Sequence, residues 1–133
     1  MTLDLLEQPQ VASEGTAASP KILIIEDEEP IAEALSYRLS RQGFQTLTAG
    51  CGRSGLALAR SERPALILLD LCLPDMDGLE VCAELTESPE TWSIPIVVVS
   101  GVSRPDIVRQ CRAAGCLYFL HKPYDPNVLL LLI

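Results

Sequence analysis

Residues 66–78 read LILLDLCLPDMDG and carry the clearest secondary-structure pattern of the chain. Four apolar residues run directly into Asp70, and a turn-rich segment then leads to Asp77 and Gly78. A short, continuous apolar run of this kind is typical of a parallel strand that is covered on both faces. Asp77 with Glu80 three residues later has the pattern of a helix N-cap and an acidic counterpart of the capping box. The stretch therefore predicts a buried strand ending at Asp70 and a helix beginning at Asp77.

Similar apolar runs alternate with helical patterns along the rest of the chain. The expected strands are residues 22–25, 44–47, 65–69, 96–99 and 117–120. Apolar residues spaced three or four apart predict helix faces formed by Ile31, Ala34, Leu35 and Leu39, by Leu56 and Ala59, and by Ile107, Cys111 and Ala114. A last helix should start near Pro126 and be short. This alternation predicts an α/β fold: a doubly wound, five-stranded parallel sheet in the flavodoxin-like order 2-1-3-4-5, with helices on both faces.

Length and charge limit the domain count and the class of partner. The 133 residues, 48% of them apolar, suit one domain with a real core. Residues 1–20 carry three acids, no bases and many small residues, so we expect a disordered leader there and one domain over residues 21–133. A net charge of -8 is a poor match for the phosphates of a nucleic acid, and we expect no direct binding to one.

Cysteine usage and hydropathy indicate the compartment. The five cysteines form no C-x-x-C pair and lie scattered through apolar runs, which favours buried thiols over a disulfide framework. No basic residue precedes Lys21, so the start of the chain lacks the basic flank of a signal peptide. The longest apolar run, residues 128–133, is far shorter than the roughly 20 residues needed to span a bilayer. We expect a soluble, cytoplasmic protein that makes no membrane contact.

Carboxylates follow two strands that should be neighbours. Glu26 and Asp27 come directly after the first strand, and Asp70 ends the third. In the order 2-1-3-4-5 these side chains meet in one crevice at the topological switch point. Packed like charges are unfavourable unless a cation joins them, and hard oxygen ligands suit Mg²⁺. The sequence therefore predicts a magnesium site, whereas Glu28 and Glu29 are expected to belong to a solvated loop.

Two further polar side chains stand at the ends of the fourth and fifth strands. Ser100 follows one run and Lys122 follows the other. A carboxylate such as Asp70 can accept a phosphoryl group to give an acyl phosphate. A hydroxyl can then donate a hydrogen bond to that group, and an ammonium can neutralise its oxygens. We therefore expect Asp70, Ser100 and Lys122 to carry the chemistry.

These residues stand in segments that resemble a response-regulator receiver domain, the phosphoacceptor half of two-component signalling. The matching segments are KILIIEDE at 21–28, LILLDLCLPDMDG at 66–78, IPIVVVSG at 94–101 and AGCLYFLHKP at 114–123. The resemblance implies that Asp70 is phosphorylated, and that Glu26, Asp27, Asp70 and the backbone carbonyl of Cys72 hold Mg²⁺. The family usually has Asp where Glu26 stands.

The same resemblance implies a switch and a set of partners. Ser100 matches the switch hydroxyl, Phe119 the switch aromatic and Lys122 the lysine beside the phosphoryl group, with a cis Lys122–Pro123 bond. The module would accept phosphoryl from a sensor histidine kinase or phosphotransfer protein and would be a signalling phosphoacceptor, not an enzyme. Its expected output surface is the fourth helix, fifth strand and fifth helix, open to an unknown downstream effector and to homodimerisation.

Two other classes remain as alternatives. A phosphatase with an aspartyl nucleophile would need a second acid two residues later, where this chain has Cys72. A nucleotide-binding or flavin-binding module of the same fold would carry a glycine-rich motif after the first strand, where this chain has acids instead.

Overall fold

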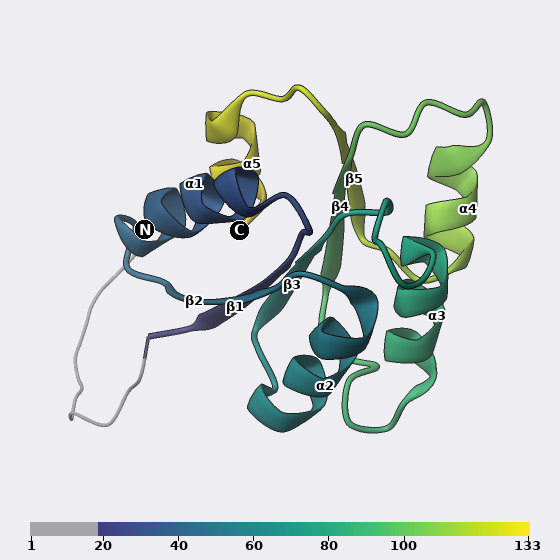
Figure 1. Ribbon diagram of the computed structural model, residues 1–133, viewed down its shortest axis with the longest axis horizontal. Helices are drawn as coiled ribbons and strands as arrows, with labels where there is room; N and C mark the ends of the chain where they lie inside the picture. Colours follow the sequence, from purple (N-terminus) through teal and green to yellow (C-terminus); the bar gives the residue numbers. More distant parts are fainter. Residues whose placement is uncertain (1–18) are drawn as a thin grey trace.

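A five-stranded parallel sheet in the order β2-β1-β3-β4-β5 forms the middle layer of the computed structural model, which describes residues 19–133 (Figure 1). The strands are β1 (Lys21–Ile25), β2 (Gln45–Ala49), β3 (Leu66–Leu69), β4 (Ile96–Ser100) and β5 (Tyr118–His121). The helices are α1 (Glu29–Ser40), α2 (Gly52–Glu62), α3 (Gly78–Glu87), α4 (Ile107–Ala113) and α5 (Pro126–Leu132). The order confirms the predicted doubly wound fold. The leader expected at residues 1–20 lies, except for its last two residues, outside the described part of the chain.

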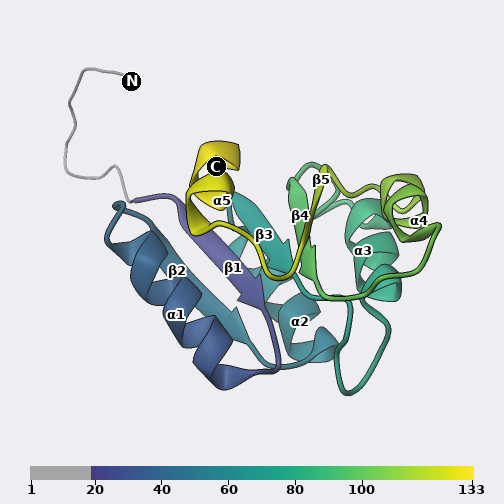
Figure 2. The ribbon, with the colours of Figure 1, turned by 90° about the horizontal axis from the view of Figure 1, so that it is seen from above.

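The helices cover both faces of the sheet and enclose two apolar cores. Helices α2, α3 and α4 pack on one face and α1 and α5 on the other (Figure 2). Alternate residues of one strand supply the two cores: Leu23 and Ile25 of β1 point to the first, Ile22 and Ile24 to the second. This explains why the central strands read as continuous apolar runs, because both of their faces are buried.

The predicted elements all exist, with boundaries displaced by one or two residues. Phe44, Ala65 and Leu117 lie just before β2, β3 and β5 and are not part of them. One predicted helix position was wrong: Ala34 is exposed, and Ala32 takes its place beside Leu35 on the buried face of α1. Positions 32, 35 and 39 follow the helical period as well as 31, 34 and 35 do, so the sequence alone could not fix the orientation of α1.

The capping box of α3 forms as the sequence predicts. The Asp77 side chain accepts a hydrogen bond from a backbone N–H of the first turn, and the Glu80 side chain accepts from the Asp77 N–H. The cysteines follow their prediction only in part, because Cys72 is exposed and Cys51 is half-buried while the other three are buried. Cys72 stands in the loop between β3 and α3, and Cys51 at the N-cap of α2, where neither is covered by the core. Across residues 19–133, no helix has the length and apolar character needed to cross a bilayer.

The register of the central strands brings the acidic residues together. Ile25 of β1 is paired with Leu69 of β3, so Glu26 and Asp70 leave the sheet side by side. The backbone N–H of Asp70 also donates to the carbonyl of Ile25. Both residues therefore start from fixed backbone positions at the carboxyl edge of the sheet.

Candidate functional site

Three carboxylates converge at the carboxyl ends of β1 and β3. Glu26, Asp27 and Asp70 each offer an oxygen atom, and these atoms lie within 4.8 Å of one another. Glu26 and Asp70 are buried, with 5% and 6% of their surface exposed, whereas Asp27 is exposed. The predicted convergence of the acidic pair with Asp70 is thereby confirmed. Glu28 is exposed and contributes its backbone, because its N–H donates to Oε2 of Glu26 at 3.2 Å.

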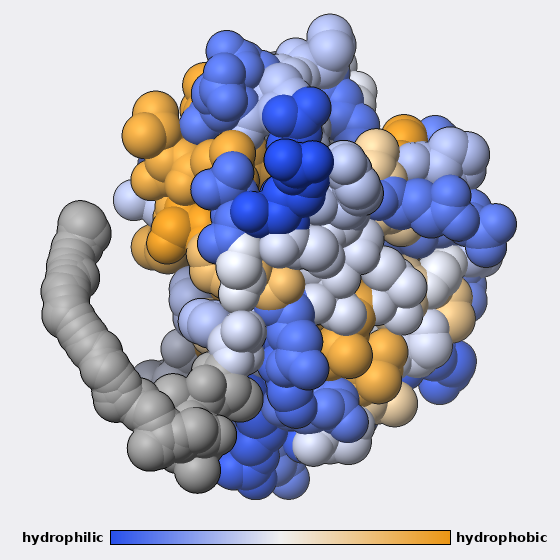
Figure 3. Space-filling model, turned by 90° about the vertical axis from the view of Figure 1, so that its left-hand side faces the viewer, coloured by the Kyte–Doolittle hydropathy of each residue, from blue (hydrophilic) through white to orange (hydrophobic). Residues whose placement is uncertain are grey.

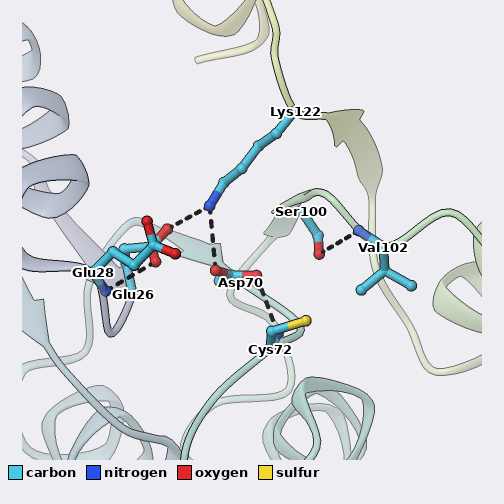
Figure 4. A network of polar contacts seen from close by, with 7 residues as sticks. All are labelled: Glu26, Glu28, Asp70, Cys72, Ser100, Val102 and Lys122. Carbon is cyan, nitrogen blue, oxygen red and sulfur yellow. Dashed lines mark hydrogen bonds and ion pairs between the residues drawn. The ribbon is translucent and has the colours of Figure 1, made fainter.

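Lys122 reaches the cluster from the end of β5. Its Nζ atom donates to Oε1 of Glu26 at 2.8 Å and to Oδ2 of Asp70 at 3.3 Å, and it lies between the two carboxylates (Figure 4). The peptide bond from Lys122 to Pro123 is cis, as the resemblance implied. One ammonium group therefore offsets part of the negative charge of two buried acids.

Burial and the contacts between Glu26 and Lys122 shift the pKa values of both groups. Burial raises the pKa of Glu26 above its ordinary value, although hydrogen bonds from Lys122 and from the Glu28 backbone act in the opposite direction. Burial by itself would lower the pKa of Lys122, but the hydrogen bond to Glu26 and the charge of Asp70 outweigh it and raise the pKa. Lys122 is therefore firmly charged at neutral pH, beside carboxylates whose like charges repel.

The loop between β3 and α3 is held against Asp70. The backbone N–H of Cys72 donates to Oδ1 of Asp70 at 3.1 Å, and Cys72 forms an isolated bridge with Asp77. The other carboxylate oxygen of Asp70 faces Lys122, so both of its oxygens have a donor on the protein (Figure 4). This contact orients the carboxylate and places the Cys72 backbone beside the cluster.

Asp75 and Gly78 also support this loop, and the sequence did not predict that role for either residue. The Asp75 carboxylate accepts from the backbone N–H groups of Gly52 and Arg53 at 2.7 and 2.9 Å, so it caps α2 from the loop. A Cβ atom at Gly78 would stand 2.8 Å from the carbonyl oxygen of Asp70, which leaves no room for a side chain. The signal available in the sequence was the Asp75-x-Asp77-Gly78 turn pattern, but its tertiary partner in α2 lies 23 residues away.

Ser100 and Phe119 come from β4 and β5, on the side of β3 away from β1. Ser100 is fully buried at the end of β4, and its hydroxyl accepts from the backbone N–H of Val102 at 3.2 Å (Figure 4). Phe119 is half-buried on β5 and lines a hollow of about 240 Å³ between α4 and β5. The structure therefore brings Ser100 to the same sheet edge as Asp70, while Phe119 borders the α4 side of β5.

The cluster suits a hard divalent cation. Its donors are carboxylate oxygens, with Asp27 open to solvent. Two of its acids are buried, and among residues 19–133 the one ammonium group paired with them is that of Lys122. Ions such as Mg²⁺ bind to a few protein carboxylates and keep several positions for water or phosphate. The three carboxylates of this cluster are ligands of that kind. The cluster can hold a metal ion.

Comparison with known proteins identifies the family. The protein-family model of the response regulator receiver domain matches residues 22–133 of this chain. The chain is 42% identical over 110 residues to the transcriptional regulatory protein AfsQ1 of Streptomyces coelicolor, covering 83% of this chain but only 48% of that longer protein. It is 33% identical to the protein PilH of Pseudomonas aeruginosa, covering 83% of this chain and 91% of PilH. Among solved structures, the chemotaxis protein CheY4 of Vibrio cholerae superimposes with a TM-score of 0.80 at 29% identity, over 86% of this chain and 96% of CheY4. The chain belongs to the response regulator receiver domain family, and it is a receiver domain of two-component phosphorelay signalling and not a classical enzyme.

Proposed function

We propose that Asp70 is the phosphoacceptor of this receiver domain and takes its phosphoryl group from a phosphohistidine of a sensor histidine kinase or phosphotransfer protein. The observation that carries the proposal is the position of the Asp70 carboxylate, held between the Cys72 N–H at 3.1 Å and the Lys122 ammonium at 3.3 Å. An oriented carboxylate with an adjacent cation is suited to attack phosphorus, because little covalent chemistry is needed beyond positioning and charge stabilisation.

The transfer makes and breaks one bond each. An oxygen of Asp70 attacks the phosphorus, the bond from phosphorus to the histidine nitrogen breaks, and its electron pair leaves with the imidazole. The Lys122 ammonium already faces Asp70, so it can neutralise negative charge on the phosphoryl oxygens as they arrive there. The Ser100 hydroxyl, now accepting from Val102, is free to donate its own proton to a phosphoryl oxygen.

We assign Mg²⁺ to the carboxylate cluster. Glu26, Asp27 and Asp70 would hold it, because their carboxylate oxygens lie within 4.8 Å of one another. The resemblance to the family adds the backbone carbonyl of Cys72, a residue whose N–H donates to Asp70 at 3.1 Å. The bound cation would supply charge neutralisation for the attacking carboxylate and the phosphoryl oxygens. Glu26 replaces the aspartate usual in the family, so its longer arm reaches Lys122 as well as the crevice.

Phosphorylation would act on the rest of the domain through Ser100 and Phe119. A new hydrogen bond from Ser100 to the phosphoryl group would draw the β4–α4 loop toward Asp70, because the same hydroxyl still accepts from the Val102 N–H of that loop. Phe119 then turns inward from the hollow between α4 and β5. This is a local charge change that shifts a two-state element, and it alters the surface formed by α4, β5 and α5.

That surface carries the exposed apolar residues expected of a binding face. They include Val108 of α4, Tyr118 of β5 and Leu131 of α5, which are 46%, 46% and 85% exposed. Figure 3 faces the side of the molecule where α1 and α5 lie, away from α4, and shows apolar side chains gathered beside hydrophilic ones on that side. We assign this α4–β5–α5 surface to a downstream effector and to homodimerisation.

The proposal is tested by intact mass after incubation with acetyl phosphate, with Mg²⁺ or with a chelator. Wild-type protein should gain one phosphoryl group only when Mg²⁺ is present, and Asp70→Asn should gain none. Asp77→Asn is the matched control, because it lies in the same loop and asparagine still caps a helix. A phosphoryl group gained by Asp70→Asn at the wild-type rate would overturn the assignment.

A further inference from the structure

Three of the five cysteines are buried in one apolar core, on the face of the sheet where α3 and α4 lie side by side (Figure 1). Cys82 is on α3, Cys111 is on α4, and Cys116 stands in the connection that leads into β5. The sulfur atoms of Cys82 and Cys116 are 2.9 Å apart, although 34 residues separate them along the chain. We propose that Cys82 and Cys116 form an intramolecular disulfide bond on exposure to a hydroperoxide, at a modification site separate from the carboxylate cluster.

Two hydrogen bonds from α3 hold the backbone around the two sulfurs, and one of them does not involve a thiol. The Thr86 hydroxyl of α3 donates to the carbonyl of Ala114 at 3.1 Å, and the Cys82 thiol donates to the same carbonyl at 3.3 Å. Gly115 has a φ of +102° and packs against Thr86, so the turn after α4 lies directly on α3. A disulfide bond is about 2.05 Å long, and the sulfurs need to approach by only roughly 0.9 Å.

A metal site made of the three thiols fits less well. Soft metals are bound by thiolates that surround one point. The three carboxylates of Glu26, Asp27 and Asp70 have ligand atoms that all lie within 4.8 Å of one another. Within residues 19–133, the three cysteine sulfurs do not form a second group of this kind. The geometry therefore favours a bond within one pair over a shared ion.

Of the two cysteines, Cys116 is the one that borders a hollow open to solvent. Cys116 lines the hollow of about 240 Å³ between α4 and β5 and is 8% exposed, whereas Cys82 is fully covered. The hydrogen bond to Cys82, together with burial, raises the pKa of the Cys116 thiol. Oxidation should therefore be slower than at an exposed cysteine of ordinary pKa, because the thiolate is the reactive form.

The proposed reaction is balanced with hydrogen peroxide as the oxidant. The Cys116 sulfur attacks one peroxide oxygen, the O–O bond breaks, and a sulfenic acid and one water are formed. The Cys82 sulfur then attacks the sulfenic sulfur, and its thiol proton leaves with the hydroxyl group as a second water. Two thiols lose two electrons in total, and one peroxide takes them up.

The bond would tie α3 to the start of β5. Cys116 lies three residues before Phe119 and directly after the turn that ends α4. Oxidation would therefore restrain the base of α4 and slow amide exchange in the α4–β5 turn. Any effect on signalling rests on the proposed function, but formation of the bond does not require phosphorylation.

The test is a peptide map of the full chain treated with hydrogen peroxide, alkylated and unfolded without a reductant. Combined cleavage after arginine and after glutamate assigns the pairing, because Arg112 separates Cys111 from Cys116 and Glu80 precedes Cys82. We expect one linked peptide pair, Cys82 with Cys116, and a loss of two hydrogen atoms that a thiol reductant reverses. Untreated protein should show the two cysteines alkylated separately.

Variants separate the pair from its neighbour. Cys82→Ala and Cys116→Ala should each abolish the linked peptides, whereas Cys111→Ala should retain them. A Cys111–Cys116 link, a link between two chains, or overoxidised Cys116 with Cys82 still free would overturn the proposal. The wild-type map decides the matter even if a core variant fails to fold. Phosphorylation of Asp70 is measured separately, so failure of one proposal leaves the other intact.

Discussion

The ammonium nitrogen of Lys122 lies 2.8 Å from a carboxylate oxygen of Glu26, although 96 residues separate them along the chain. Glu26 is buried, and its carboxylate would be costly at this position without a cation. The pair shows how the domain holds a dense acidic cluster before any metal ion binds. It also makes the stability of the metal-free protein dependent on pH.

Glu26→Gln should change that pH dependence. Burial raises the folded-state pKa of Glu26 above 4.5, so the folded protein binds this proton more tightly than the unfolded chain does. Stability contributed by the protonated form is therefore lost as pH rises from about 4.5 through the raised pKa. We expect the glutamine variant to lose less stability than wild type over this interval in urea unfolding with a chelator. Glu28→Gln, at an exposed position, should follow the wild-type curve, and parallel curves for all three proteins would contradict this account.

Mg²⁺ affinity should depend on Asp27 far more than on Glu28. Asp27 is within 4.8 Å of both other carboxylates, whereas Glu28 contributes its backbone N–H to Glu26. Losing one of the few charged ligands should weaken binding by about tenfold or more, or roughly 1.4 kcal/mol. Calorimetric titration of Asp27→Ala and Glu28→Ala with Mg²⁺ checks this, and equal affinities would remove Asp27 from the proposed site.

Gly78→Ala should destabilise the domain, because a methyl group there would meet the Asp70 carbonyl at 2.8 Å and the Leu71 backbone at 2.5 Å. Overpacking of this kind typically costs about 1–3 kcal/mol. Gly50→Ala is the matched control, since a Cβ atom at Gly50 meets nothing within 4 Å and its change should stay within about 0.5 kcal/mol. Urea unfolding of both variants measures the difference, and similar midpoints would show that the loop yields easily.

Phosphorylation should promote dimerisation through the α4–β5–α5 surface. Light scattering on protein treated with acetyl phosphate and Mg²⁺ should show an increase from one chain toward two. Leu117→Lys, at a residue 57% exposed beside β5, should prevent the increase. Tyr37→Lys on α1, at a residue 65% exposed outside this surface, should leave it unchanged. An unchanged mass at high concentration for the phosphorylated wild type would argue against a dimer.

The aspartyl phosphate should be long-lived for a receiver domain. Cys72 and Val102 stand two residues beyond Asp70 and Ser100. The resemblance to receiver domains implies that these two positions flank the route of an attacking water, and neither side chain can orient that water as a carboxylate or amide would. The combined variant Cys72→Asn with Val102→Glu should therefore lose phosphate about tenfold faster or more, at roughly 1.4 kcal/mol per tenfold. Decay of the phosphorylated protein is followed by intact mass. If the variant decays no faster than wild type, solvent access and not water orientation sets the lifetime.

Much of the fold could be predicted because its signals are local. The four-residue apolar run before Asp70 and the cap at Asp77 each need only a few neighbouring residues to be interpreted. The alternation of strands and helices then permits few topologies, and the order 2-1-3-4-5 was confirmed. The face of α1 was less determined, since Ala32 and Ala34 both fit the helical period and only packing against the sheet separates them.

The order of elements, the strand-end positions of Glu26, Asp27 and Asp70, and the family could all be inferred from the sequence. The long-range partners of individual side chains became known from the packed structure. Asp75 caps α2 across 23 residues, and Cys82 meets Cys116 across 34 residues. Strand and helix patterns arise from neighbouring residues along the chain, whereas a hydrogen bond or a sulfur contact depends on the packed distance between elements, to within a few tenths of an ångström.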